Sequence, residues 1–166
     1  MSPAFAEGRP VTDPELATDR PELERRRSLD DTEAFPGNWV CLAGDYGNDG
    51  IWSGAGLFCT VGDLPVLIAL QKAIEAWAFN YAGRGPADAN FSEPHGRWFD
   101  TTGFELARQV SAALPHWTVA FSSEFGVYKT PSGRSFGIVT TDGTFADLTI
   151  EQEAVRKALV DAERGV

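Results

Sequence analysis

The sequence predicts a single α+β domain in which an antiparallel sheet, made of an N-terminal hairpin and a C-terminal meander, packs against about three helices. Short apolar runs bounded by turn residues occur near both ends of the chain, as expected for strands. Three segments repeat apolar residues at steps of three and four, as expected for helices, and these are 65–82, 103–114 and 151–163. With 166 residues, the chain is long enough for one domain with a substantial core.

The composition divides the chain into two parts. Residues 1–35 contain nine acids, five arginines and four prolines, but almost no periodic apolar residues. Glu22 and Arg26 have the spacing of an i,i+4 ion pair, which would support a short charged helix, but the composition favours a flexible arm. We therefore expect one folded domain over 36–166, preceded by this arm.

The domain is expected to begin with a β-hairpin. Trp39–Leu42 is a short apolar run, and the segment Asp45–Gly50 after it is rich in turn-forming residues. The next segment, 51–61, is strand-like in its second half, and its glycines at 54 and 56 suggest a bulge or a bend.

The clearest predicted helix follows this hairpin. Pro65 comes after Asp63 at a first-turn position, where the missing N–H of proline costs nothing. The helix over 65–82 places its apolar residues on one face, namely Leu67, Leu70, Ile74, Trp77 and Tyr81.

A long polar loop over 83–101 and a second helix over 103–114 are predicted next. Thr102 and Glu105 have the spacing of a capping box, which marks the start of that helix. Its buried face is expected to consist of Phe104, Ala107, Val110 and Leu114. Pro115 ends it.

The C-terminal part is predicted to form an antiparallel meander followed by a third helix. Four strand-like runs are separated by turn residues, and they are Trp117–Ser122, Phe125–Thr130, Ser135–Thr140 and Thr144–Leu148. Thr149 and Gln152 again have capping-box spacing. The helix over 151–163 is expected to bury Val155, Leu159 and Ala162.

Charge and composition exclude several classes of function. Asp and Glu number 24 against 14 Lys and Arg, which gives a net charge of −10 and a pI near 4.6. This charge repels nucleic-acid phosphates, so DNA or RNA binding is not expected, whereas a basic protein would be attracted. No signal peptide is visible, and the longest apolar run, within 64–70, is too short to cross a membrane, so we expect a cytoplasmic location and no membrane partner.

The cysteines and histidines do not suggest a metal site or thiol catalysis. Cys41 and Cys59 lie in apolar runs, where buried free thiols are expected rather than a disulfide framework. Neither thiol has the sequence context of an activated nucleophile. His95 and His116 are the only histidines, and no zinc-binding spacing such as H-x-x-x-H or C-x-x-C occurs. No metal or other cofactor is therefore expected.

The turn Asp45–Trp52 is the first candidate site, because it gathers carboxylates, an amide and glycines between two apolar runs. Three of its residues match the first, fifth and sixth positions of a calcium loop, and they are Asp45, Asp49 and Gly50. Gly47 and Gly56 stand where two oxygen ligands are needed, which removes most of the charge that offsets dehydration of the ion. A hairpin turn is the favoured interpretation, with Tyr46 and Trp52 as candidate contacts for a partner.

The four-residue run from His95 to Trp98 is the second candidate site. Arg97 suits a carboxylate or phosphate, and Trp98 can stack on a planar or cationic group. In the alternative interpretation, Trp98 anchors the loop to the core while Arg97 pairs with one of the many acids. An enzyme at this loop would use His95 as acid or base, Arg97 as an anion clamp and Asp45 or Asp49 as the orienting carboxylate.

Two sets of residues resemble a group of small uncharacterised bacterial proteins. The first set is Leu42–Trp52, Asp63–Pro65 and Trp77, and the second is Gly103–Ala107, Leu114 and Trp117–Val119. In that group a "DYG…W…LP" first half is followed by a "G…LA…L…V" second half. The resemblance covers about residues 40–121. It implies a bacterial cytoplasmic protein and carries no known activity. The glycine-rich Ser53–Gly56 segment and the N-terminal arm depart from this pattern.

These observations favour a non-enzymatic acidic protein-binding module that neutralises or regulates a basic protein, as toxin-immunity proteins and antitoxins do. Tyr46, Trp52 and Trp98 are the expected partner contacts. A small enzyme or small-molecule binder is the alternative, in which the His95–Trp98 run works with Asp45 and Asp49. No complete catalytic set of known spacing accompanies these residues, which favours the first hypothesis.

Overall fold

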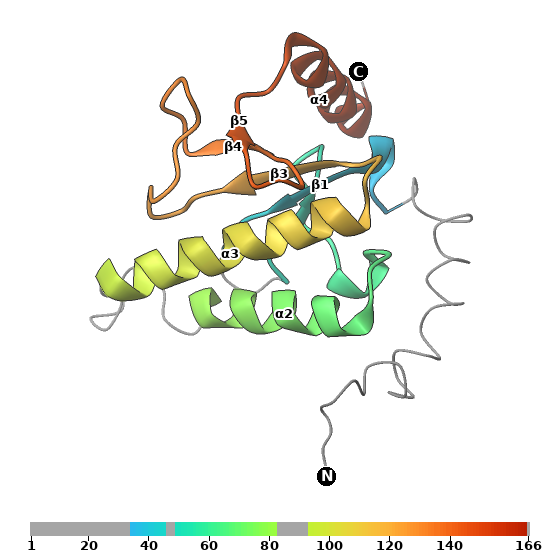
Figure 1. Cartoon of the computed structure of the whole chain (residues 1–166). Coiled ribbons are helices and arrows are strands. Elements are labelled where there is room, and N and C mark those ends of the chain that lie inside the picture. Colours follow the sequence, from blue (N-terminus) through green and yellow to red (C-terminus); the bar gives the residue numbers. More distant parts are fainter. Residues whose placement is uncertain (1–33, 46–48, 83–92, 166) are drawn as a thin grey trace.

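A five-stranded mixed sheet forms the middle layer of the protein (Figure 1). The computed structural model describes residues 34–45, 49–82 and 93–165. The strands in these ranges are β1 (Trp39–Leu42), β2 (Ile51–Ser53), β3 (Thr118–Ser122), β4 (Phe136–Val139) and β5 (Phe145–Ala146). The α-helices in the same ranges are α2 (Ile68–Ala82), α3 (Glu93–Ala113) and α4 (Ile150–Arg164), and two short 3-10 helices are η2 (Pro36–Asn38) and η3 (Val61–Asp63). The predicted α+β class is confirmed.

The sheet is not purely antiparallel, so that part of the prediction is wrong. The strand order is β2-β1-β3-β4-β5, and the central strands β1 and β3 run parallel, pairing Trp39 with Thr118 and Leu42 with Phe121. The other neighbouring strands are antiparallel, including the predicted hairpin of β1 and β2. The connection explains the difference, because the chain passes through α2 and α3 before β3, and a helical crossover of this kind brings back a parallel strand.

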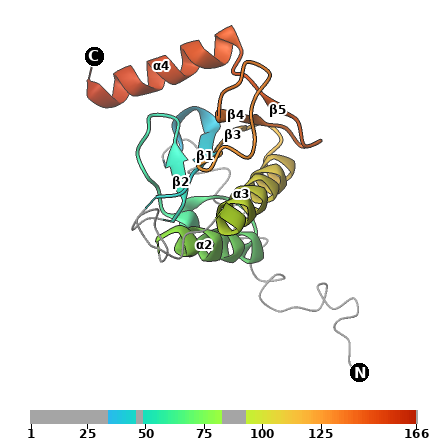
Figure 2. The ribbon, with the colours of Figure 1, turned by 90° about the vertical axis from the view of Figure 1, so that its left-hand side faces the viewer.

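Helices cover both faces of the sheet. Figure 1 shows α2 and α3 below the sheet and α4 above it, and the turned view of Figure 2 shows α4 crossing the top of the molecule. On the α2 and α3 side, strand residues such as Val40, Leu42 and Phe121 belong to the main core. On the α4 side, Trp39 and Cys41 belong to a smaller cluster. All four residues of β1 are buried because both faces are covered.

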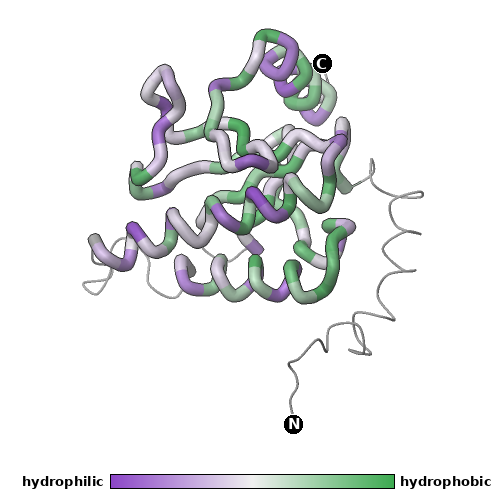
Figure 3. Tube along the Cα trace, in the orientation of Figure 1, coloured by the Kyte–Doolittle hydropathy of each residue, from purple (hydrophilic) through white to green (hydrophobic). Residues whose placement is uncertain are grey.

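The apolar segments in Figure 3 follow this layering, with the central strands and the start of α2 coloured as hydrophobic. The face of α2 predicted to be apolar does point into the core at Ile74, Trp77 and Tyr81. Leu67 precedes the first residue of the helix and is 37% exposed, because α2 starts at Ile68 instead of at the predicted residue 65.

Helix α3 begins well before the predicted start, and the predicted loop over 93–101 is therefore wrong. Pro94 lies in its first turn, and the fully buried Phe99 extends its apolar face toward the N-terminus. The Trp77 indole stacks on the Phe99 ring at a centroid distance of 4.6 Å and donates a 2.8 Å hydrogen bond to the Phe99 carbonyl. Thr102 is consequently an interior helix residue and not a cap. Residues 83–92, the first part of the predicted loop, lie outside the described residues.

Of the four strands predicted near the C-terminus, the run 125–130 is a turn. The runs on either side of it form β3 and β4, and β5 is reduced to Phe145–Ala146. Three backbone amides of this turn, those of Phe125, Val127 and Tyr128, are bonded to side chains, as described below. The expected strand in the second half of 51–61 is also wrong, since β2 is confined to Ile51–Ser53 and Phe58 only makes a single bridge to Trp52.

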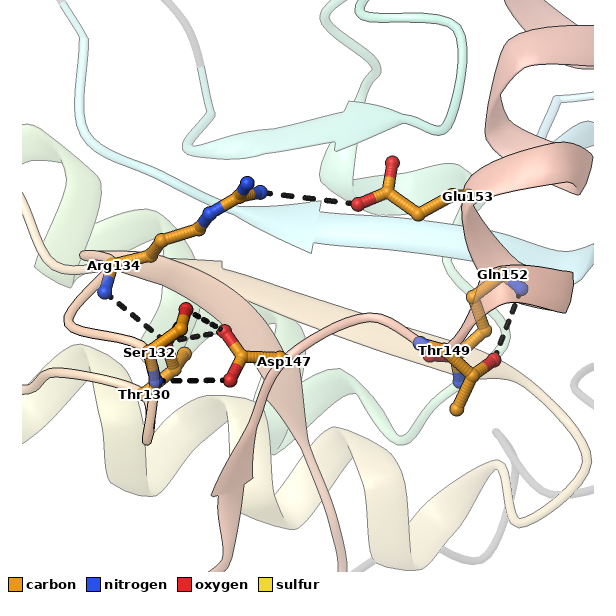
Figure 4. Close-up of polar contacts among 7 residues, drawn as sticks. All are labelled: Thr130, Ser132, Arg134, Asp147, Thr149, Gln152 and Glu153. Atoms are coloured by element: carbon orange, nitrogen blue, oxygen red, sulfur yellow. Dashed lines mark hydrogen bonds and ion pairs between the residues drawn. The ribbon is translucent and has the colours of Figure 1, made fainter.

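The predicted capping box at the start of α4 is confirmed (Figure 4). The Gln152 amide donates a 3.1 Å hydrogen bond to the Thr149 hydroxyl, and the Thr149 amide donates a 2.9 Å bond to the Gln152 side chain. The predicted burial of α4 is wrong, because none of its residues is buried and Val155 is 43% exposed. Leu159 packs beside Trp39 of the sheet. Helix α4 therefore lies over this face of the sheet but does not pack tightly against all of it.

A carboxylate ties the 130–134 turn to the segment that leads into α4 (Figure 4). Asp147 accepts hydrogen bonds from the Thr130 hydroxyl at 2.6 Å and the Ser132 hydroxyl at 2.5 Å. These hydroxyl bonds hold the pKa of Asp147 below its usual value. At the other side of the same turn, Arg134 lies 3.8 Å from Glu153 of α4. The segment before α4 therefore helps to set the position of the helix, together with the Arg134–Glu153 ion pair.

The predicted N-terminal arm, residues 1–35, lies outside the described residues except for its last two. None of the helices in the described part of the chain is long and apolar enough to span a lipid bilayer.

Candidate functional site

A buried carboxylate organises the turn that follows β3. Asp100 of α3 is fully buried, and its Oδ2 accepts three hydrogen bonds, from the Ser123 hydroxyl at 2.5 Å and from the amides of Phe125 and Val127 at 3.0 and 3.1 Å. The Ser123 hydroxyl in turn accepts a 3.0 Å bond from the Tyr128 amide. Several backbone N–H groups converging on one anion fix a loop firmly. The run 125–130 is a turn for this reason, despite its strand-like sequence.

The turn places an aromatic ring against the first half of α3. Phe125 is 36% exposed, and its ring packs where a side chain at Gly96 would project, since a Cβ there would lie 2.8 Å from the ring. A cavity of about 210 Å³ lies beside this contact, lined by Gly96, Arg97, Phe125 and Val127. Glycine at position 96 is therefore what allows the turn to approach the helix.

Negative charge concentrates around Glu124, the residue before Phe125. The pKa of the Glu124 carboxyl is raised, first because neighbouring protein atoms desolvate it and further because the carboxylates of Asp100 and Asp45 are close. A hydrogen bond with Ser122 opposes this shift. Glu124 thus lies in a negative electrostatic environment, which would favour a cation placed beside it.

The residues predicted as an active site are not gathered in this cavity. Arg97 lines it, whereas His95, Asp45 and Asp49 are not among its lining residues. Asp49 accepts a 2.9 Å hydrogen bond from the Val61 amide and so holds η3 against the hairpin. His95 lies on α3 and stacks on Trp98, with ring centroids 5.6 Å apart. Asp45 lies close enough to Glu124 to raise its pKa.

The predicted partner contacts lie on different layers. Trp98, on α3, is 42% exposed. Trp52 lies in the outer cluster on the opposite side of the sheet, half-buried, where its indole donates a 3.2 Å hydrogen bond to the Ala43 carbonyl and meets Phe58 edge-on. Tyr46 lies outside the described residues. Trp52 and Trp98 therefore do not form one surface.

Both thiols are free, as predicted, and both are held in the neutral form. Burial raises the pKa of Cys41 to about 12, with a lowering effect from Arg156 and a raising effect from Glu124. Burial also raises the pKa of Cys59 to about 11, assisted by Asp63. Thiols of this kind are poor nucleophiles at neutral pH. In the described part of the chain, no group of three or more His, Cys, Asp or Glu side chains is arranged to hold a metal ion.

No protein family model, curated protein or solved structure matches this chain. The function of the site is therefore inferred from its own chemistry.

The sequence interpretation missed the residues that shape the site. Asp100 lies within the segment predicted to be a polar loop, Phe125 begins a predicted strand, and Glu124 lies between two predicted strands. A turn signal was present at Gly126, whose φ is +73°. That signal indicates a turn, but it does not identify the distant carboxylate to which the turn is bonded.

Proposed function

We propose that the protein is a non-catalytic binding module that neutralises or regulates a basic protein partner, with Glu124 and Phe125 at the contact. The observation that carries the proposal is a partly exposed aromatic ring, Phe125, on the residue that follows a carboxyl group in a negative environment, Glu124. A Lys or Arg side chain of the partner would lay its apolar stem on Phe125 and place its charge beside Glu124.

The charge of the whole chain supports the same kind of partner. A net charge of −10 accelerates the encounter with a basic protein and repels an acidic one. Arg97 lines the cavity and would oppose a cation placed deep inside it. The partner's charge is therefore expected at the Glu124 end, with an apolar group in the cavity itself.

Trp98 is retained in this proposal as a second contact. Its side chain is 42% exposed, and aromatic residues are frequent binding anchors. Trp52 is left out because its indole is hydrogen-bonded on the other side of the sheet. Tyr46 stays a prediction from the sequence.

An enzyme that combines His95, Arg97 and the two aspartates of the hairpin is supported less well. Asp49 is bonded to the backbone of Val61, and the cavity beside Arg97 is lined by neither His95 nor Asp45. A general acid or base must lie within hydrogen-bond reach of the group on which it acts, so these side chains would need to move together.

The proposal can be tested by affinity capture from an extract of the native host, with proteins and small molecules both identified by mass spectrometry. The tagged full chain is compared with three variants: Glu124→Gln combined with Phe125→Ser, Trp98→Ala, and a control, Phe79→Ala. Phe79 is 72% exposed on α2, so the control removes an aromatic surface group at a different place.

We expect a basic protein to be captured by the wild type and the Phe79 variant, and to be lost in the Glu124/Phe125 variant. Capture should also weaken as salt rises from low to physiological concentration, because long-range attraction between exposed charges is screened. Recovery of the same proteins with all variants, or of a metabolite and no protein, would contradict the proposal.

A further inference from the structure

A second cavity, of about 240 Å³, lies between α4 and the outer face of the sheet. Three aromatic side chains contribute to its wall, and the lining residues that matter here are Trp39, Cys41, Trp52, Ser122, Phe136 and Arg156. None of the residues of α4 is buried. The helix therefore covers this face of the sheet without filling the space between the two, and the cavity remains. Sites for drug-sized ligands measure roughly 300–1,000 Å³, so this cavity suits a smaller molecule.

Arg156 is the one charged side chain among the residues that line this cavity. Its guanidinium lies over the Phe136 ring, 4.6 Å from the ring centroid. The next residue of α4, Lys157, is paired with Asp161 at 3.0 Å. Arg156 makes no ion pair with any residue in the described ranges, although the chain has 24 acids for 14 basic residues. Its planar set of N–H donors is thus held in place by an aromatic ring instead of a carboxylate.

Chemistry at the cavity favours binding without reaction. The Cys41 thiol on its wall stays protonated, since burial raises its pKa to about 12 even though Arg156 lowers it. A protonated thiol does not attack an electrophile. The remaining wall offers aromatic faces, which suit stacking, and the hydroxyls of Ser53 and Ser122. Both hydroxyls already have protein partners, since Ser53 accepts bonds from the amides of Ala55 and Leu57 and Ser122 is bonded to Glu124.

We infer that this cavity binds a small carboxylate with a flat apolar body. The body would lie among the indoles of Trp39 and Trp52, and the carboxylate would take two parallel hydrogen bonds from Arg156. A guanidinium fork matches the spacing of the two carboxylate oxygens, whereas a cationic or neutral molecule of the same shape would leave its donors unused. The Phe125 ring of the proposed partner contact packs against α3 on the other side of the sheet, whereas Glu124 is hydrogen-bonded to Ser122 at the wall of this cavity. The inference does not rest on the proposed function.

The test uses 1-naphthoate as the probe and titration calorimetry on the full chain. Two variants on the same helix each remove one positive charge: Arg156→Met, which keeps an apolar stem at the cavity, and the control Lys157→Met. 1-Naphthylmethylamine serves as a probe with the same rings and the opposite charge. Circular dichroism establishes that both variants are folded, and Arg156→Lys, which keeps the charge without the planar fork, provides an additional comparison.

We expect 1-naphthoate to bind the wild type and the Lys157 variant equally, and to bind the Arg156→Met variant at least about tenfold more weakly, because a hydrogen bond to a charged group is lost. The amine should bind the wild type at least about tenfold more weakly than the carboxylate does. The inference is overturned if naphthoate does not bind at millimolar concentration, if it binds the Arg156→Met variant as tightly as the wild type, or if the amine binds equally well. Failure of partner capture with intact naphthoate binding would reject the proposed function alone.

Discussion

The Ser123 hydroxyl donates a 2.5 Å hydrogen bond to Asp100 Oδ2, and this pair joins α3 to the turn after β3. The same oxygen also holds two backbone amides of the turn. The exposed surface around Glu124 and Phe125 therefore depends on a carboxylate buried beneath it. Asp100 thus links α3 to the proposed contact, in addition to the packing of Phe125 on Gly96.

Replacing Asp100 with asparagine should destabilise the protein by about 1–3 kcal/mol, because the charge that strengthens these bonds is lost. Asp100 Oδ1 is buried without a hydrogen-bond partner among the described residues, so an amide group placed there would be unsatisfied as well. The free energy of unfolding, measured with urea, reports this loss.

The exposed Asp161→Asn on α4 is the matched control and should change stability by less than about 1 kcal/mol, since its pair with Lys157 lies at the surface. Equal urea midpoints for wild type and Asp100→Asn would show that this carboxylate does not organise the turn.

Glu124→Gln should raise the melting temperature at neutral pH. The folded-state pKa of Glu124 is raised above the ordinary 4.5, so the folded protein binds this proton more tightly than the unfolded chain does. Ionisation of Glu124 therefore weakens stability as pH rises through the raised pKa, and glutamine avoids that loss. Below pH 4.5 the carboxyl is protonated in both states, and the advantage of the variant should disappear.

Thermal unfolding of both proteins across this pH range provides the measurement. Glu75→Gln, at an exposed position on α2, serves as a charge-matched control. A Glu124 variant whose advantage persists unchanged at acidic pH would point to a cause other than this ionisation.

Gly103→Ala should destabilise the fold by about 1–3 kcal/mol, although alanine is the better helix former. A Cβ at this position would lie 2.5 Å from the Trp77 ring of α2 and 2.8 Å from the Phe121 ring of the sheet. Gly62→Ala, whose nearest neighbour would be 3.9 Å away, is expected to be nearly neutral. Comparable melting temperatures for the two variants would rule out this tight packing.

The two thiols should react slowly with a disulfide reagent at pH 8, and Cys59 before Cys41. The pKa is about 11 for Cys59 and about 12 for Cys41, against an ordinary 9.0, so each thiolate fraction is far below that of an unfolded thiol. The reaction rate at Cys59 should therefore be at least about tenfold lower than that of an unfolded thiol. Unfolding in urea should abolish the difference, and Cys41→Ser assigns the slower phase. A rapid phase from Cys41 in the folded protein would contradict its burial.

Local signals in the sequence predicted most of the elements but not the parallel arrangement of β1 and β3. The Thr149–Gln152 capping box and the apolar face of α2 depend on neighbours a few residues away, so the sequence reveals them directly. The predicted start of α3 is too late, although Pro94 and the seven-residue spacing from Phe99 to Leu106 are helix signals. The parallel pairing of β1 with β3 depends on a tertiary crossover, which no local pattern encodes.

The candidate site was less predictable than the fold. The Asp49 carboxylate occurs in a turn that resembles a calcium loop, yet it accepts a hydrogen bond from the Val61 amide. Only the folded chain brings these two groups together. Arg156 has the sequence context of any charged residue on an amphipathic helix. Its contact with the ring of Phe136 depends on where α4 crosses the sheet.

The parallel pairing of β1 and β3 has a consequence for how the chain folds. The β1–β2 hairpin can form from neighbouring residues alone. The other edge of β1 stays unpaired until β3, which follows α2 and α3 in the chain, has docked against it. Contacts between distant segments slow folding, and an unpaired apolar edge invites association with other chains in the meantime. The four apolar residues Trp39–Leu42 are therefore where aggregation during refolding is expected to start.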